Sequence, residues 1–241
     1  SSAPYDGDPA AALTAVAALP GAAWAGRLDG AGWAVASGSP ECLLRVSDGR
    51  IETRPIKGTR PRTAAGRREL DASSKERAEH VMIVDLERND LARVAETGSV
   101  LVEELYAVHA WCDLWQAQSV VSARLRPGVG LAELLRAVCP GGSVTGAPKR
   151  AALALIAGLE PVGRGPAMGA LGYLSPAGLE LGLTIRTLAA AGGRLHVWAG
   201  GGITWPSDPT AEVAEAAAKA APLRAAVDAA SSARVSSARP V

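Results

Sequence analysis

Phenylalanine is missing from this chain of 241 residues, and cysteine is scarce. Without phenylalanine, a hydrophobic core must be built mainly from leucine, valine, isoleucine and tryptophan. The three cysteines, Cys42, Cys112 and Cys139, lie far apart and form no CxxC pair, which argues against a zinc site or a disulfide framework. Such sparse thiols fit a reducing compartment.

Long apolar runs and a strong charge bias are absent as well. No stretch reaches the roughly 18 apolar residues that a bilayer span needs, and the N-terminus lacks the basic and apolar segments of a signal peptide. The 25 basic and 24 acidic residues leave a net charge of +1. This balance excludes an electrostatic reason for binding nucleic acid or an anionic membrane, and we expect a soluble cytoplasmic protein.

Helical and strand patterns are present together without regular alternation, which favours an α+β fold. Asp8 and Pro9 suit the start of a helix, and Asp48-Gly49 is a hairpin signal. We expect residues 55–68 to form a basic loop, Pro222 to end or kink the last helix, and residues 227–241 to form a disordered tail. The predicted helices are residues 8–19, 71–95, 131–138, 149–159 (amphipathic) and 210–226. The predicted strands are residues 32–36, 41–46, 51–53, 100–104, 119–125, 167–174, 181–190 and 195–199.

Two pairs of glutamates have helical spacing. Glu76 and Glu79 lie three residues apart on one predicted helix, and Glu212 and Glu215 do so on another. Residues at this spacing share a helix face, so four carboxylates from two helices could surround one hard cation such as Mg²⁺. The alternative for each pair is a solvated surface charge.

Glycine-rich and basic segments offer further candidate sites. Residues 141–149 (GGSVTGAPK) and Gly200–Gly202 could present backbone amides to an anion, although the first lacks the spacing of a P-loop. Arg186 lies in a strand-like run, where a buried cation needs an anionic partner. Lys57, in the tight segment PIKGT, could act as a nucleophile. The alternatives are ordinary turns, a core salt bridge and an exposed base.

Taken in order, six segments resemble the chorismate-binding enzymes, a family that includes anthranilate, aminodeoxychorismate, isochorismate and salicylate synthases. The segments are residues 39–46 (SPECLLRV), 54–62 (RPIKGTRPR), 76–95 (ERAEHVMIVDLERNDLARVA), 140–161 (PGGSVTGAPKRAALALIAGLEP), 169–188 (GALGYLSPAGLELGLTIRTL) and 199–220 (AGGGITWPSDPTAEVAEAAAKA). The resemblance covers roughly residues 5 to 225. It implies antiparallel sheets with helices packed outside, forming one catalytic domain over residues 1–226.

The resemblance also implies a role for each matching residue. Glu79 and Glu215 match direct Mg²⁺ ligands, while Glu76 and Glu212 match the neighbours that hold its waters. Glu41 matches the general acid at the departing C4 hydroxyl, where protonation helps because hydroxide is a poor leaving group. The residues that match the pocket for the substrate carboxylates are Lys149, Tyr173, Arg186, Gly200, Gly201 and Gly202.

Lys57 is the residue that best separates the branches of the family. Aminodeoxychorismate synthases resemble this chain in carrying the lysine of PIKGT, whereas anthranilate synthases usually have alanine there. Thr145 matches the members that use ammonia. The resemblance therefore implies amination of chorismate to 4-amino-4-deoxychorismate, the precursor of 4-aminobenzoate and folate. Because no amidotransferase nucleophile motif is evident, a separate glutamine amidotransferase would supply the ammonia.

Three features depart from the family pattern. Gln116 stands where a histidine is usual, and Gln can hydrogen-bond a substrate hydroxyl but cannot shuttle a proton. His109 could replace that histidine only if the alignment shifts, and Val213 replaces a usual tyrosine. The similarity begins just upstream of the SPE segment, so we expect the family's N-terminal half to be lacking. The alternatives are therefore anthranilate synthase or another chorismate enzyme, and a truncated, inactive or partner-dependent member.

Overall fold

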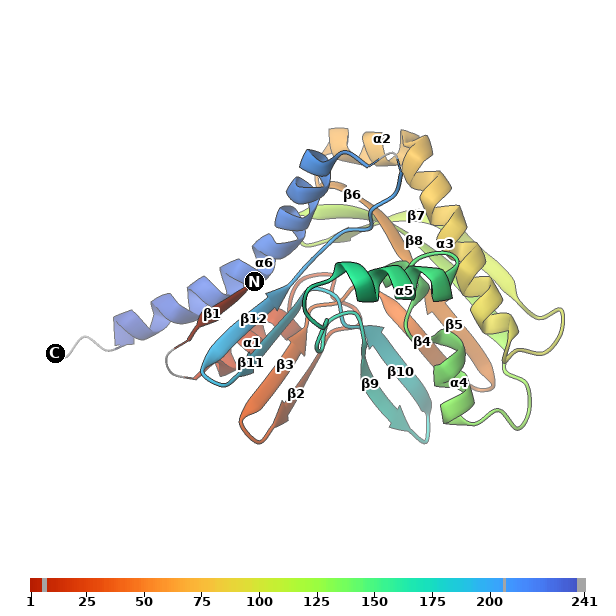
Figure 1. The fold of residues 1–241 in the computed structure, drawn as a ribbon, viewed down its shortest axis with the longest axis horizontal. Coiled ribbons are helices and arrows are strands. Elements are labelled where there is room, and N and C mark those ends of the chain that lie inside the picture. Colours follow the sequence, from red (N-terminus) through yellow and green to blue (C-terminus); the bar gives the residue numbers. More distant parts are fainter. Residues whose placement is uncertain (6–7, 206, 238–241) are drawn as a thin grey trace. The chain divides into compact units, whose positions relative to one another are not determined.

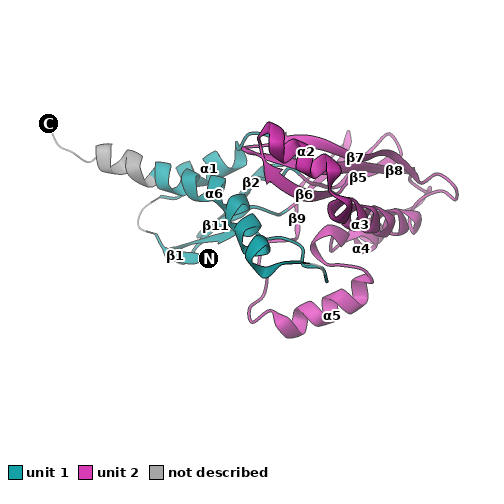
Figure 2. Ribbon diagram, turned by 90° about the horizontal axis from the view of Figure 1, so that it is seen from above, with its two compact units in different colours: residues 1–40, 184–241 teal, residues 41–183 magenta. Residues whose placement is uncertain are grey.

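The computed structural model describes residues 1–5, 8–205 and 207–237. Its antiparallel sheets and packed helices confirm the predicted α+β class. The chain divides into two compact units, unit 1 with residues 1–40 and 184–241, and unit 2 with residues 41–183 (Figure 2). The predicted catalytic domain, residues 1–226, spans both. None of the described helices combines the length and the apolar character needed to cross a bilayer.

Unit 1 is a five-stranded antiparallel sheet packed against two helices (Figure 1). The sheet order is β1-β12-β11-β3-β2, and the core joins Leu13 of α1, Leu188 of β11 and Leu223 of α6, all fully buried. Burying such leucine side chains contributes about 1.5–3 kcal/mol each. The elements are β1 Ser2–Pro4, α1 Ala10–Ala17, β2 Gly26–Gly30, β3 Trp33–Ser37, β11 Thr187–Ala191, β12 Arg194–Trp198 and α6 Pro209–Ser237.

The structure shows where the two helices of unit 1 begin and end, which can be compared with the predicted boundaries. Helix α1 begins after Pro9, and the Asp8 carboxylate accepts a hydrogen bond from the Ala10 amide at 2.9 Å, as the predicted cap implied. Pro222 was predicted to end or kink the last helix; it does not end it, because α6 continues through this proline to Ser237. Helix α6 thus occupies residues 227–237 of the predicted tail, and residues 238–241 lie outside the described residues.

Unit 2 is built on a seven-stranded antiparallel sheet of order β6-β8-β5-β4-β10-β9, with β7 also pairing with β8. The Asp48-Gly49 turn joins β4 and β5 as predicted, and both residues have positive φ (49° and 74°). The strands are β4 Cys42–Ser47, β5 Arg50–Arg54, β6 Ile56–Pro61, β7 Leu101–Trp111, β8 Leu114–Arg124, β9 Ala170–Ser175 and β10 Gly178–Leu183.

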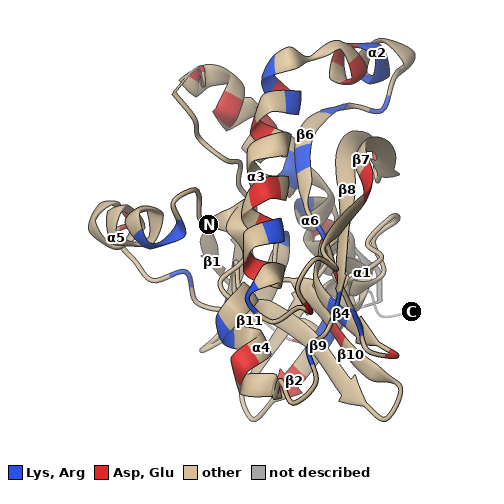
Figure 3. Cartoon of the chain, turned by 90° about the vertical axis from the view of Figure 1, so that its right-hand side faces the viewer, with Lys and Arg blue, Asp and Glu red and all other residues tan. Residues whose placement is uncertain are grey.

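The long helix α3 positions much of unit 2, because it packs along β8 and β6 (Figure 1). Its N-cap is Ser73, whose Oγ accepts a hydrogen bond from the Glu76 amide at 3.2 Å. Figure 3 shows acidic and basic residues spaced along this helix. The helices of the unit are α2 Ala64–Ala72, α3 Ser74–Ala92, α4 Leu131–Val138, the 3₁₀ turn η1 Gly142–Val144 and α5 Lys149–Leu159.

Two local predictions were wrong, one in unit 2 and one at its boundary. Much of the expected loop, residues 55–68, is strand β6, because β8 supplies backbone partners and Gly58 (φ 76°) accommodates a bulge. The expected strand 181–190 is two strands, β10 and β11, separated around Arg186, whose φ of 55° interrupts extended backbone. Helix α5 is present as predicted but buries none of its residues, so its apolar side chains contribute no core face.

Candidate active site

The glycine-rich loop, residues 140–148, joins two of the predicted catalytic groups in unit 2. Glu41, just before β4, is only 5% exposed, and the Ser143 hydroxyl donates a hydrogen bond to its Oε1. The Lys57 amine, on β6, donates to the Ser143 carbonyl at 3.1 Å. A single loop residue therefore contacts both the predicted acid and the predicted nucleophile.

Gly58 allows strand β6, which carries Lys57, to pack closely against helices α2 and α3. A Cβ atom at Gly58 would lie 2.7 Å from Leu70 Cδ1 and 3.3 Å from Glu76 Oε2. With φ at 76°, this position favours glycine on both steric and backbone grounds. The Gly58 of PIKGT is thus explained by close packing in the structure, next to Lys57.

Helix α3 contacts the glycine-rich loop through two carboxyl groups that the sequence analysis did not single out. Glu87 Oε1 accepts a hydrogen bond from the Gly142 amide at 3.1 Å, and Asp90 accepts one from the Lys149 amine. Burial, reinforced by the charge of Asp90, raises the pKa of Glu87 to about 8. Burial also raises the pKa of Asp90, although Lys149 opposes this. Their i, i+3 spacing in DLERND was the available signal.

Thr145 lies on this loop and Lys149 directly follows it, and both side chains bond to other residues of unit 2. Besides its ion pair with Asp90, the Lys149 amine lies 3.5 Å from the Val138 carbonyl. The Thr145 hydroxyl donates to the Gly141 carbonyl at 2.9 Å. The loop is therefore held by its own side chains as well as by α3.

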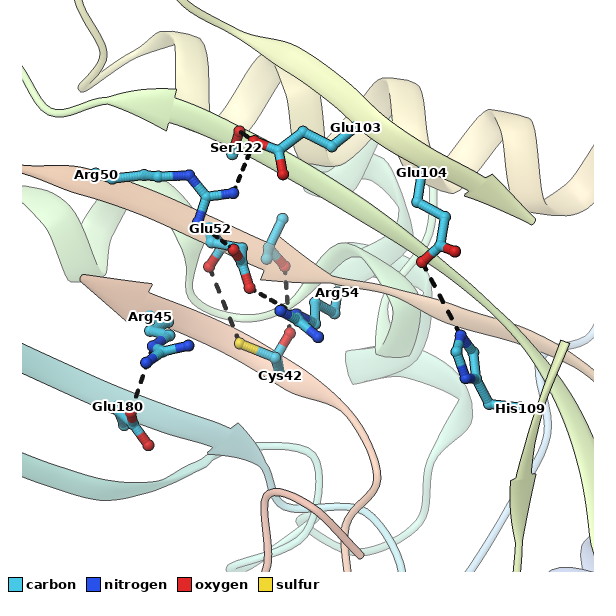
Figure 4. A network of polar contacts seen from close by, with 11 residues as sticks. Cys42, Arg45, Arg50, Glu52, Arg54, Glu103, Glu104, His109, Ser122 and Glu180 are labelled. Carbon is cyan, nitrogen blue, oxygen red and sulfur yellow. Dashed lines mark hydrogen bonds and ion pairs between the residues drawn. The ribbon is translucent and has the colours of Figure 1, made fainter. Parts of the chain in front are cut away.

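Gln116 lies on β8 in the buried interior of unit 2. Its amide Nε2 is 3.4 Å from Thr59 Oγ1, and the side chain is 3% exposed. The strand register places His109 opposite Gln116, but the His109 side chain is 54% exposed and lies 4.0 Å from Glu104 (Figure 4). His109 therefore does not occupy the buried position of Gln116.

A buried histidine nearby was missed by the sequence analysis. His80 of α3 is fully buried, and its Nε2 lies 2.6 Å from Ser119 Oγ. Burial, together with the positive charge of Lys57, lowers the pKa of His80 to about 4. The side chain is thus neutral at pH 7. Its helical spacing from Glu76 was visible in the sequence, but its partner on β8 was not.

The predicted metal ligands form two pairs, one in each unit. In unit 2, Glu76 accepts a hydrogen bond from Arg60 at 3.1 Å, and Glu79 lies 3.7 Å from the Lys75 amine. In unit 1, Ser207 donates to Glu212 at 2.6 Å, and Lys219 donates to Glu215. A Cβ at Gly201 would lie 3.2 Å from Glu212 and 3.8 Å from Glu215, so that glycine lies directly beside the pair. No cluster of three or more metal-binding groups occurs among the described residues.

The remaining predicted substrate contacts lie on β9 in unit 2 and in unit 1. Tyr173 of β9, in unit 2, is 58% exposed. In unit 1, Arg186 is buried, and its carbonyl accepts a hydrogen bond from the Gly38 amide at 3.1 Å. Gly200, Gly201 and Gly202 are exposed. The structure thus brings together Lys57, Glu41, Thr145 and Lys149 within unit 2 and adds Ser143, Glu87 and Asp90 to them.

A second polar network in unit 2 is satisfied by its own ion pairs (Figure 4). Glu52 of β5 is 2% exposed and accepts hydrogen bonds from Arg54, at 2.6 Å, and from Arg50. Burial opposes ionisation, but the bonds from Arg54 and Arg50 lower the pKa of Glu52 below its usual value. Arg50 also contacts Glu103 at 2.7 Å. Because these charges neutralise one another, we assign this network a structural role.

Comparison with known proteins agrees with the resemblance seen in the motifs. A family model described as chorismate binding enzyme matches residues 1–225. The chain belongs to this family. It is 44% identical over 223 residues to an aminodeoxychorismate synthase of Streptomyces griseus, a match that covers 89% of the chain and 31% of the relative. It is 45% identical over 193 residues to an anthranilate synthase component 1 of Streptomyces coelicolor, covering 77% and 38%.

The fold comparison gives the same family. The crystal structure of anthranilate synthase component I from Streptococcus pneumoniae superposes with a TM-score of 0.81 at 34% identity. That match covers 92% of this chain and 51% of the solved chain. The chain therefore spans about a third of the length of the two curated relatives and about half of the solved structure.

Proposed function

We propose that this chain carries the catalytic groups for a Mg²⁺-dependent amination of chorismate to 4-amino-4-deoxychorismate, in the 4-aminobenzoate and folate branch. The observation that carries the proposal is the connection of Lys57 and Glu41 through Ser143. A primary amine and a carboxyl group held by the same loop residue suit a displacement that needs a nucleophile and an acid.

In this mechanism Lys57 and Glu41 act in one step. The lone pair of the Lys57 amine forms a bond to C2 of chorismate, the two conjugated ring double bonds shift, and the C4–O bond breaks. Glu41 gives its proton to the departing hydroxyl, which leaves as water. Ammonia then adds at C4, the two double bonds shift back, and the C2–N bond to Lys57 breaks. The ammonium group formed at C4 returns a proton to the Glu41 carboxylate, and Lys57 is released, with the ring still non-aromatic.

We propose that the two glutamate pairs hold the metal ion. Carboxylate oxygens are suitable Mg²⁺ donors, and both pairs have the one-turn spacing that directs two carboxylates to the same side of a helix. Glu79 and Glu215 would be direct ligands, with Glu76 and Glu212 holding its waters. When bound, the ion would orient the ring carboxylate of chorismate.

The other predicted residues are proposed to bind substrate or ammonia. Thr145 would help to place ammonia, and Gln116 would hydrogen-bond a substrate hydroxyl. The residues proposed to bind the carboxylates of chorismate are Lys149, Tyr173, Arg186, Gly200, Gly201 and Gly202. We propose that a separate glutamine amidotransferase supplies the ammonia in the cell.

Product identity tests the proposal directly. The purified chain is mixed with chorismate, Mg²⁺ and ammonium chloride, and the products are separated and identified by mass spectrometry. We expect 4-amino-4-deoxychorismate, with no product when EDTA is added or ammonium is left out. Formation of anthranilate or isochorismate, or the absence of any product, would overturn the proposal.

Anthranilate synthesis is the second candidate. It is favoured by the 45% identity to an anthranilate synthase component 1, which is as high as the identity to the aminodeoxychorismate synthase. The same reaction mixture separates the two, because anthranilate is aromatic and fluorescent whereas 4-amino-4-deoxychorismate is not aromatic. A fluorescent product of anthranilate mass would select this second function.

A further inference from the structure

Glu87 is a buried carboxyl group with no role in the steps proposed above. It projects from α3, is 2% exposed, and its Oε1 accepts the hydrogen bond from the Gly142 amide at 3.1 Å. Its Oε2 has no hydrogen-bond partner among the described residues. Burying a carboxyl group costs free energy unless hydrogen bonds compensate for the lost hydration. The hydrogen bond between Glu87 and the loop therefore holds the two in a fixed position.

The loop lies close to the side chains of α3 at this point. A Cβ at Gly142 would lie 2.7 Å from Leu86 Cδ2 and 2.9 Å from Glu87 Oε1. Both distances are shorter than normal packing allows, so a side chain here would force Leu86, Glu87 or the loop to move. The Glu87 hydrogen bond and the absence of a Cβ therefore fix the same point of the backbone.

Ser143 follows immediately, and its position decides where two reactive groups lie. Its hydroxyl contacts Glu41 and its carbonyl contacts Lys57. We infer that Glu87 is a positioning residue that fixes Ser143 through Gly142, and through Ser143 aligns the Lys57 amine with the Glu41 carboxyl group. This inference rests on the proposed function, in which these two groups act in the same step.

Burial first, and then the charges around Glu87, determine its protonation state. Asp90 and Glu41 favour its neutral form, while Lys149 and the Gly142 hydrogen bond favour its ionised form. With a pKa of about 8, Glu87 is mostly neutral at pH 7 and accepts the amide through a carboxylic acid oxygen. A glutamine side chain has nearly the same shape and offers the same carbonyl acceptor, whereas leucine has similar size and no acceptor.

Two variants separate positioning from simple packing. At pH 7, we expect Glu87→Gln to keep kcat within about threefold of wild type, and Glu87→Leu to lower kcat by about 10- to 100-fold, since small misplacements of reacting groups have effects of this size. The KM for chorismate should change less than about twofold in both. Glu133→Gln, which removes an exposed carboxylate from α4, is the matched control and should behave as wild type.

An NMR titration judges the inference without relying on the product. The ¹⁵N and ¹H shifts of the Gly142 amide should titrate near pH 8 in wild type and stay constant in Glu87→Gln. Equal kcat in Glu87→Leu and wild type, or a Gly142 amide that does not titrate near pH 8, would overturn the inference. If Glu87→Leu fails to fold, the inference is tested by comparing the NMR titration curves of wild type and Glu87→Gln. A different amination product with a titrating Gly142 amide would contradict only the proposed function.

Discussion

The interiors of the two units differ in chemical character. In unit 1, helices α1 and α6 bury alanine, valine and leucine against the sheet. In unit 2, the space between α3, β6, β8 and the glycine-rich loop holds polar groups. Among the residues whose burial is described, every buried carboxyl group and the buried histidine belong to unit 2. These residues are Glu41, Glu52, Glu76, His80, Glu87 and Asp90.

This difference suggests that the apolar core of unit 1 mainly stabilises the fold, whereas the buried polar groups of unit 2 mainly position the side chains of the candidate site. Apolar burial in unit 1 contributes to the free energy of folding wherever the side chains lie in the core. Buried polar groups in unit 2 lose hydration, and the raised pKa of Glu87 and lowered pKa of His80 show that burial disfavours their charged forms. In return, hydrogen bonds fix where these groups lie. We therefore expect substitutions of the buried polar groups of unit 2 to affect activity most, and substitutions in the apolar core of unit 1 to affect stability most.

The largest expected effect is that of Lys57→Ala. If Lys57 is the nucleophile, its removal should lower kcat by at least about 10³-fold, or roughly 4 kcal/mol of transition-state stabilisation. Stability should fall by only about 1 kcal/mol, because one hydrogen bond to Ser143 is lost. Steady-state rates and thermal melts measure both quantities. Arg124→Ala, which removes a cation whose side chain is 76% exposed, is the control. Unchanged turnover in Lys57→Ala would contradict the covalent step.

Leu188→Ala should give the opposite result in unit 1. Leu188 is fully buried between the sheet and its helices, so truncation should lower the free energy of unfolding by about 2–5 kcal/mol. At a temperature where the variant is folded, kcat should stay within about twofold of wild type, because no reacting group is proposed to contact this side chain. Urea unfolding followed by circular dichroism measures the stability. Leu28→Ala in β2, at a side chain 50% exposed, is the matched control and should cost far less. A large loss of kcat in folded Leu188→Ala would remove the contrast.

The pH dependence of stability tests whether unit 2 really buries a neutral carboxyl group. Glu87 has a pKa of about 8 when folded and about 4.5 when unfolded, so between these values the unfolded chain releases a proton that the folded chain keeps. The contribution of Glu87 to the free energy of unfolding is fully present below about pH 4.5. It is lost as the pH rises towards 8, by at most about 1.4 kcal/mol per pH unit.

Glu87→Gln should lack this decline. Urea unfolding at pH 5, 6, 7 and 8 should therefore show the stability of wild type falling relative to the variant, and Glu133→Gln should follow wild type. Parallel pH profiles for wild type and Glu87→Gln would show that Glu87 is ionised in the folded chain.

Local signals explain which parts of this architecture were predictable. The Asp48-Gly49 hairpin, the Asp8 cap and helix α4 follow from residues adjacent in sequence, and all three were expected. Strand β6 was not expected, because its basic, proline-flanked sequence is extended only through pairing with β8. The division at Arg186 was missed for a similar reason, since nothing in LTIRTLA marks a residue with positive φ.

The candidate site shows the same limit more clearly. Lys57 and Glu41 were named through motifs, but the residue that connects them was not. Ser143 lies 86 residues from Lys57 and 102 from Glu41, so only the folded loop shows that it contacts both. Glu87 was likewise one charge among several on a helix until its contact with Gly142 was known.

The smallest expected effect is at Thr145, a half-buried residue of the same loop. Its hydroxyl donates to the Gly141 carbonyl at 2.9 Å, and Thr145→Val removes that donor while nearly keeping the shape. The loss of one such bond is worth about 1 kcal/mol, or roughly fivefold in an equilibrium.

If Thr145 helps to place ammonia, this loss should raise the KM for ammonium about fivefold at saturating chorismate, with kcat nearly unchanged. Thr145→Ser keeps the hydroxyl and is the matched variant. Initial rates over a range of ammonium concentrations distinguish the two. An unchanged KM for ammonium in Thr145→Val would show that the Thr145 hydroxyl only stabilises the loop. Ammonia would then be selected by groups more deeply buried in unit 2.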